Sequence, residues 1–359
     1  MSIVAHTYPF IIGADTHSRN HALAILAPTG EVIDEQIFPT TKTGLARAVD
    51  WACRRTGGDL DALWVIEGIG TYGAQLAQTV HDAGYSPAEA PRMNARARRG
   101  TGKSDPLDAR RIAAAALPLN TTQLRRPREQ DGTRAAIRVL IGARDHMSTE
   151  RTATINALIA LVRTIDLGID ARNGLAASRI TIIAAWRTRT EPLAMTTARA
   201  EAVRLARRID ALDKELHTNR NTLTTLIRDT PAAGLLELPG IGPVTAAVVL
   251  AAWSHPGRIR SEAAFANLAG VSPIPASSGN TVRHRLNYGG DRRLNRALHM
   301  AIVTRIRMDP TTRAYIEKRT AQGRTSKEIR RCLKRYLARQ LYRHLATAYK
   351  IPSPALDNT

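Results

Sequence analysis

Apolar and polar positions in the first third of the chain alternate as they do in short strands of a half-buried sheet. The first apolar run leads into Asp15, and the last leads into Glu67. Between them, Pro28, Thr29 and Gly30 form a turn that joins two alternating segments. The pattern predicts a meander of three strands followed by a separate fourth strand. The predicted strands cover residues 10–14, 21–27, 32–38 and 63–66.

Apolar residues spaced three and four positions apart predict helices in the same third of the chain. Leu45 and Val49 share one face of such a segment, and Asp105 opens another that contains Ile112. The predicted helices cover residues 43–54, 72–83 and 105–117. Residues 8–125 are therefore expected to form an α/β domain.

The middle of the chain, residues 126–230, has the pattern of long helices. One seam alternates steps of three and four without a break, and its only polar member is Asn219. Such a polar position can fix register and oligomeric state in a coiled coil. We expect a coiled-coil dimerisation element, although a helical hairpin within one chain would produce the same seam. Its members are Ala202, Leu205, Ile209, Leu212, Leu216, Asn219, Leu223 and Leu226.

Residues 231–348 are rich in small and basic side chains and predict a mainly α-helical C-terminal domain. The segment LPGIGPVTA (238–246) reads as a turn followed by the start of a helix. A second short helix is expected at 265–268, a loop at 276–280, and a disordered tail at 349–359. Two strongly basic helices are predicted at 292–307 and 327–345.

Composition adds a strong positive charge to this picture. The 359 residues, enough for two or three domains, include 52 Lys and Arg against 31 Asp and Glu. The formal net charge is +21 and the pI is near 11.0. An excess this large repels itself, and nucleic acid would offset the repulsion. A general basic bias of the source proteome is the alternative explanation.

Other features of the composition exclude several classes of protein. The two cysteines, Cys53 and Cys332, lie too far apart to suggest a metal or disulfide framework. No apolar run approaches the roughly 20 residues of a membrane span, and the N-terminus lacks a signal-peptide pattern, so we expect a cytoplasmic protein. The low aromatic content of 4% argues against a base-stacking platform. The histidines are scattered and show no metal-ligand spacing.

Four carboxylates stand where a metal site would require them. Asp15 and Glu67 follow the first and fourth predicted strands, and Asp105 and Asp108 share one face at the start of a helix. Hard cations such as Mg²⁺ bind carboxylate oxygens, and clustered carboxylates without a cation would repel one another. Each residue also has a structural interpretation, since strand-end Asp residues form turns, Asp105 before Pro106 suits a helix cap, and Asp108 complements the helix dipole.

Longer strings in the chain resemble a known family. IGADTHSRNHALAI, VIEGIGTYG and GKSDPLDARRIA resemble the N-terminal DEDD domain of RuvC-like insertion-sequence transposases of the "one-ten" family. LPGIGPVTA and AFANLAGVSPIPASSGNTVRHRL extend the resemblance to the C-terminal part, whereas the middle matches only in being helical. The resemblance implies an RNase H-like (RuvC-like) fold for the N-terminal domain and a serine-bearing transposase domain at the C-terminus.

The resemblance also implies roles for individual residues. The acidic residues of the family fall on Asp15, Glu67, Asp105 and Asp108, which would hold Mg²⁺, with Mn²⁺ as a substitute. The serine nucleophile of the family falls on Ser278, immediately before a glycine, and would form a covalent link to a DNA phosphate. From chemistry alone, Ser277 is an equal candidate and the loop composition is common.

Glycines and cations supply the predicted contacts to nucleic acid. Gly240 and Gly242 would form a helix-hairpin-helix-like turn whose amides bind a DNA phosphate, although an ordinary glycine-rich connection is the alternative. Most of the basic residues near the predicted sites would position phosphates. These residues are Arg92, Arg96, Arg98, Arg99, Lys103, Arg283, Arg285, Arg292 and Arg293.

These features together predict a Mg²⁺-dependent DNA transposase that acts through a serine–phosphate intermediate. The resemblance further implies a structured guide (bridge) RNA as a partner and a homo-oligomer, either a dimer or a tetramer. One alternative is a RuvC-like junction-resolving endonuclease whose C-terminal domain only binds DNA. A non-catalytic nucleic-acid-binding scaffold is another, but an intact set of four carboxylates argues against it.

Overall fold

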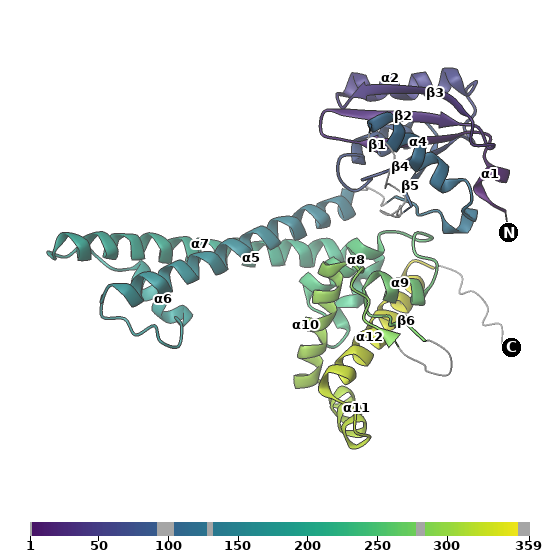
Figure 1. The fold of residues 1–359 in the computed structure, drawn as a ribbon. Helices are drawn as coiled ribbons and strands as arrows, with labels where there is room; N and C mark the ends of the chain where they lie inside the picture. The colour runs from purple at the N-terminus through teal and green to yellow at the C-terminus, as the bar shows by residue number, and fades with distance from the viewer. Residues whose placement is uncertain (1, 92–103, 128–131, 278–283, 351–359) are drawn as a thin grey trace. The chain divides into compact units, whose positions relative to one another are not determined.

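The computed structural model of the chain describes residues 2–91, 104–127, 132–277 and 284–350. They belong to two units, Met1–Arg128 and Glu129–Thr359 (Figure 1). The first unit is a mixed α/β structure and the second is mostly helical, as the sequence predicts. The finer division into three domains and a tail stays a prediction.

The first unit is built on a five-stranded sheet with the order β3-β2-β1-β4-β5. The strands β1, β2 and β3 pair antiparallel, while β4 and β5 run parallel to β1. The four predicted strands are confirmed. The fifth was missed because its four residues include a proline and read as part of the polar stretch that follows. The strands are β1 (Ile11–Thr16), β2 (Asn20–Leu26), β3 (Val32–Pro39), β4 (Leu63–Ile66) and β5 (Ser86–Glu89).

Helices cover both faces of this sheet. One apolar core joins it to α2 (Lys42–Arg55) and α3 (Ala74–Asp82), and the other joins it to α1 (Val4–Thr7) and α4 (Asp105–Ala116). Side chains along β1 alternate between these cores, with Ile12 in the first and Ile11 in the second. The same alternation assigns Gly13 and Asp15 to the α4 side. A short 3₁₀ helix at Thr121–Gln123 follows α4.

Gly13 lets α4 approach the sheet closely. A Cβ atom on Gly13 would lie 2.1 Å from the carbonyl oxygen of Ala109 and 2.7 Å from the amide nitrogen of Ala113. Only glycine leaves room for the helix backbone at this distance. The middle of α4 is thereby held close to the middle of β1.

A long helical hairpin begins the second unit (Figure 1). The helices α5 (Gly132–Thr164) and α7 (Leu193–Arg228) pack together, and α6 (Ala177–Ala184) packs against α7. The side-chain amide of Asn219 donates to the carbonyl oxygen of Leu140 at 3.0 Å, and both oxygens of Glu150 accept from Arg208. The residue numbers of the contacting partners fall along α7 as they rise along α5, so the two helices run antiparallel.

This packing corrects the interpretation of the seam as a dimerisation surface. Ile209, Leu212 and Leu223 are completely buried, and Asn219 is nearly so, within one chain. The seam is that of an intrachain hairpin, the alternative that the spacing left open. It therefore gives no reason of its own to expect an oligomer.

The base of the hairpin shares an apolar core with the C-terminal helices. The helix α8 is buried along nearly its whole length, because its residues are apolar on every side. The predicted short helix and the two basic helices are confirmed as α9, α10 and α12, whereas α11 and the small hairpin β6–β7 were not predicted. None of the helices in the described ranges combines the length and the apolar character that a bilayer crossing requires. The elements are η3 (Pro231–Glu237), α8 (Pro243–Trp253), α9 (Glu262–Leu268), β6 (Ile274–Pro275), β7 (His284–Arg285), α10 (Arg292–Met308), α11 (Pro310–Ala321) and α12 (Ser326–Ala348).

Candidate functional site

The ends of β1 and β4 bring two of the predicted acidic residues to one edge of the sheet. Glu67 directly follows β4, and its amide donates to the carbonyl oxygen of Ala14 at 2.9 Å. The hydroxyl of Thr16 donates to the carbonyl oxygen of Glu67 at 2.8 Å. These bonds fix the backbone of Glu67 beside Asp15. The Asp15 side chain is buried, whereas Glu67 is exposed.

The start of α4 supplies the other two carboxylates. Ser104 is the N-cap residue of α4, and its side chain makes no capping hydrogen bond. Asp105 is the first helical residue and not the N-cap that its position before proline suggested. Asp105 is exposed. Asp108, one turn further along, is buried and accepts a hydrogen bond from Arg111 at 3.0 Å.

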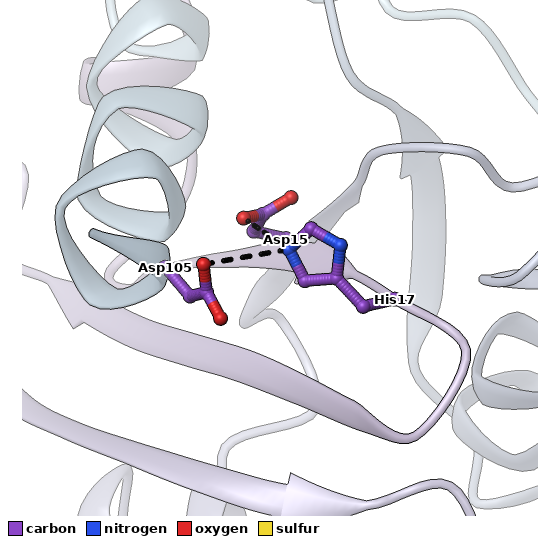
Figure 2. Close-up of side chains that lie close together, drawn as sticks. All are labelled: Asp15, His17 and Asp105. Carbon is purple, nitrogen blue, oxygen red and sulfur yellow. Dashed lines mark hydrogen bonds and ion pairs between the residues drawn. The ribbon is translucent and has the colours of Figure 1, made fainter. Parts of the chain in front are cut away.

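His17 joins these two elements and was not among the residues predicted for the site. Its Nε2 atom lies 3.0 Å from Oδ2 of Asp15 and 3.6 Å from Oδ1 of Asp105. Figure 2 shows the imidazole ring facing both carboxylates. Among the described residues, the donor atoms that lie within 4.8 Å of one another belong to Asp15, His17 and Asp105. The carboxylates of Glu67 and Asp108 are outside this group of three.

A usable signal for His17 was nonetheless present. Residues two positions apart in a strand point to the same face, so a histidine two places after Asp15 continues the line of side chains that faces α4. Spacing among the histidines alone carries no such signal, because the partners of His17 are the carboxylates of Asp15 and Asp105.

Burial and charge make Asp15 an unusual carboxylate. Burial raises the pKa of Asp15 above its ordinary value, and the nearby carboxylates of Asp108 and Asp105 raise it further. The interaction of Asp15 with His17 opposes these effects.

The glycines of the LPGIGPVTA turn differ in their surroundings. A Cβ atom on Gly240 would lie 2.7 Å from the carbonyl oxygen of Ala301, so its close backbone contact is with α10. Gly240 has a φ of +73°, in the region that favours glycine. Gly242, the N-cap residue of α8, is exposed and has open space at its Cβ position. Gly242 is therefore the more exposed of the two glycines.

Comparison with known proteins decides the family of the chain. Residues 232–317 match the model of the "Transposase IS116/IS110/IS902 family". Residues 12–166 match a second model, described as a transposase and named for the DEDD transposases of the IS110 type. The chain belongs to this transposase family. Members of the family are enzymes that cleave and recombine DNA.

Proteins of insertion elements resemble the transposase over most of its length. It is 25% identical to the "Insertion element IS110 uncharacterized 43.6 kDa protein" of Streptomyces coelicolor, over 88% of each chain. It is 24% identical to the IS900 42 kDa protein of Mycobacterium paratuberculosis, over 88% of this chain and 90% of that one. A third relative, the IS116 44.8 kDa protein of Streptomyces clavuligerus, is 24% identical over 67% of this chain and 70% of its own.

The donor set of the transposase fits a hard divalent cation. Carboxylate oxygens are the preferred ligands of Mg²⁺ and Mn²⁺, and one imidazole nitrogen is compatible with Mn²⁺. A buried carboxylate beside two others is electrostatically unfavourable, and a bound cation would relieve that repulsion. The chemistry of Asp15, Asp105 and their neighbours is therefore compatible with a divalent cation.

Several predicted contacts of the transposase lie outside the described residues. They are Ser278, Arg92, Arg96, Arg98, Arg99, Lys103 and Arg283. Ser277, at the border of this segment, and Arg285, in β7, are both exposed. Arg293 forms an ion pair at 2.7 Å with Asp145 of α5, a carboxylate that also pairs with Arg296. Arg292 lines a cavity on the same unit.

Proposed function

We propose that this transposase cleaves and rejoins DNA at a divalent-metal centre in an RNase H-like N-terminal unit. The observation that carries the proposal is the meeting of Asp15, His17 and Asp105 at the junction of β1 and α4, with all three donor atoms within 4.8 Å of one another. The pairing of β1 with β4 supports the RNase H-like fold, because such a fold makes the first and fourth strands neighbours.

Asp15 and Asp105 would hold the cation, with Asp108 and Glu67 completing the acidic set. When bound, a divalent cation stabilises the negative charge that develops on a phosphate during cleavage. His17 contacts both carboxylates and orients them, as groups around metal ligands commonly do. Glu67 is fixed by its backbone on the neighbouring strand end, where its exposed side chain is accessible to ligand or substrate.

The nucleophile that this proposal assigns is the hydroxyl of Ser278, on the strength of the family resemblance. Attack on a DNA phosphate forms a bond between the serine oxygen and phosphorus. The bond from phosphorus to the 3′ oxygen breaks, and the proton leaves the serine and ends on the released 3′ hydroxyl. A later attack by a 3′ hydroxyl reverses these changes and frees the serine.

The proposal includes two partners besides the element DNA. The resemblance points to a guide RNA that selects the target, and the net charge of +21 suits a protein that binds more than one polyanion. A homo-oligomer would allow the acidic site of one copy and the serine of another to act on the same DNA.

The test incubates purified protein with Mg²⁺, element-end DNA and the flanking non-coding RNA, and resolves the products on denaturing gels. We expect the wild type to cleave the DNA and form a protein–DNA adduct. Asp105→Asn should reduce cleavage by at least about 10²-fold, and Ser278→Ala should abolish the adduct. Asp50→Asn, which removes an exposed carboxylate on α2, is the control.

The outcomes separate the proposal from its alternative. A junction-resolving nuclease would keep its Mg²⁺-dependent cleavage in Ser278→Ala and form no adduct. Cleavage by Asp105→Asn at the wild-type rate would refute the metal centre itself.

A further inference from the structure

A cavity in the second unit is strongly basic. It has a volume of about 550 Å³ and is lined by residues of β7, the start of α10, α11 and α12. One carboxylate, that of Glu328, lines it, together with six cationic side chains. These cations are Arg292, Arg319, Arg324, Arg331, Lys334 and Arg335.

Among the described residues, Glu328 is the one carboxylate that lines the cavity, and it is already engaged. Glu328 accepts hydrogen bonds from the backbone and hydroxyl of Thr325 and lies 3.7 Å from Arg324. Among the described residues, no carboxylate lies within ion-pair distance of Arg292, Arg331 or Lys334. Most of the positive charge in the cavity is therefore not balanced within the described chain.

Lys334 shows the electrostatic consequence of this arrangement. Its ammonium group donates to the side-chain oxygen of Asn295 at 3.1 Å. Burial lowers the pKa of Lys334, and the neighbouring charges of Arg331 and Arg292 lower it further. Three cations held together in a concave site repel one another, and a bound anion would reverse that repulsion.

An exposed aromatic ring stands in the same cavity. Tyr288 lines it and is 74% exposed, although tyrosine is usually more buried. Such a ring can stack on a nucleobase, whatever the identity of the base. The low aromatic content of the chain counts against a platform for a run of bases, but one base needs only one ring.

We propose that this cavity binds a single unpaired nucleotide of a nucleic-acid strand. Its phosphate contacts Arg292, Arg331 and Lys334, and its base stacks on Tyr288. The volume is within the range of sites that enclose small ligands, and a base in a duplex must leave its stack before it can enter such a site. The inference rests on the proposed function only in taking nucleic acid as the partner, since the metal centre plays no part in it.

Binding of short oligonucleotides to the full-length protein tests this inference. Fluorescence anisotropy would compare a single-stranded DNA, a single-stranded RNA and a DNA duplex of equal length, all in EDTA. We expect Arg331→Gln and Tyr288→Ala each to weaken single-strand binding by about five-fold or more, and Tyr288→Phe to bind as the wild type does. The duplex should lose less affinity than the single strand.

The matched control is Arg330→Gln. Arg330 is the neighbour of Arg331 on α12, is exposed and does not line the cavity, so the variant removes the same charge outside the site. It should change binding by less than about two-fold. Thermal unfolding of each variant, compared with that of the wild type, identifies any loss that comes from misfolding.

A selective loss on DNA or on RNA supports the site and identifies which strand supplies the nucleotide. Equal losses in Arg331→Gln and Arg330→Gln would show a general charge effect and overturn the inference. So would an unchanged affinity in Tyr288→Ala. Because the assay contains EDTA, a failure of this inference does not count against metal-dependent cleavage. Likewise, a failure of the cleavage test does not count against nucleotide binding in this cavity.

Discussion

Asp15 is buried and has two carboxylate neighbours, and this combination destabilises the folded protein when no cation is bound. Its exposed fraction is 7%, and burial, followed by the charges of Asp108 and Asp105, raises its pKa. An acid whose pKa is higher in the folded state binds more protons there than in the unfolded state. The metal-free protein therefore loses stability as the pH rises from the ordinary value of 3.8 through the raised pKa.

Asp15→Asn should remove this destabilisation. At pH 7 in EDTA, we expect the free energy of unfolding of the N-terminal unit to rise, because an uncharged amide replaces the buried carboxylate. Added Mg²⁺ or Mn²⁺ should stabilise the wild type but not the variant. Urea unfolding measures both effects, with Asp50→Asn as the control. Equal stabilisation of Asp15→Asn by the cation would contradict the assignment.

At the scale of single residues, the sequence predicted the carboxylates but not their surroundings. The order of Asp15, Glu67, Asp105 and Asp108 on strand ends and a helix start was visible in the hydrophobic pattern. The contact of His17 with Asp105 was not, because it depends on how closely α4 packs on β1. The distance between α4 and β1 depends on Gly13. A glycine has no side chain, so it contributes nothing to the hydrophobic pattern from which the elements were predicted.

The packing of α4 on β1 is the element-scale feature on which the site depends. We expect Gly13→Ala to destabilise the N-terminal unit by roughly 1–3 kcal/mol, because the new methyl group would overlap the backbone of α4. The helix must shift and take Asp105 with it, so metal affinity should fall as well. Thermal unfolding and Mn²⁺ titration measure the two effects.

Gly70→Ala is the matched control for this substitution. A Cβ atom on Gly70 meets nothing within 4 Å, and the residue lies in the same unit. The free energy of unfolding of Gly70→Ala should stay within about 0.5 kcal/mol of that of the wild type. A Gly13→Ala protein as stable as Gly70→Ala would show that α4 is not held at β1 in the way described.

The hairpin of α5 and α7 makes a second element-scale prediction. Asn219 is buried and donates to Leu140, so Asn219→Asp would remove the donor and bury a charge. We expect a loss of about 2–4 kcal/mol in the free energy of unfolding at pH 7. Asn221→Asp, an exposed isosteric change on the same helix, should be nearly neutral. Chemical unfolding compares them, and similar losses would argue against the hairpin register.

The elements show where sequence patterns stop being informative. An unbroken seam on α7 predicts a long helix with a buried stripe, but an apolar stripe is the same whether its partner is α5 or a second chain. Similarly, β5 is too short and polar to be distinguished from a loop, and it becomes a strand only because β4 presents a free edge.

At the scale of the whole molecule, the excess positive charge dominates. Binding to DNA should release counterions in proportion to the phosphates neutralised, so the logarithm of the affinity should fall linearly with the logarithm of the salt concentration. With six or more phosphates contacted, the affinity should drop by roughly 10³-fold between 50 and 200 mM salt. Anisotropy titrations measure the slope. A slope near zero would mean that the charge of +21 serves another purpose.

The most direct test of the metal centre is anomalous diffraction from crystals of the protein soaked in Mn²⁺. We predict a peak in the anomalous difference map at about 2.1 Å from carboxylate oxygens of Asp15 and Asp105, and no peak at this place in Asp105→Asn crystals. A wild-type map with strong Mn²⁺ peaks elsewhere and none between β1 and α4 would contradict the account.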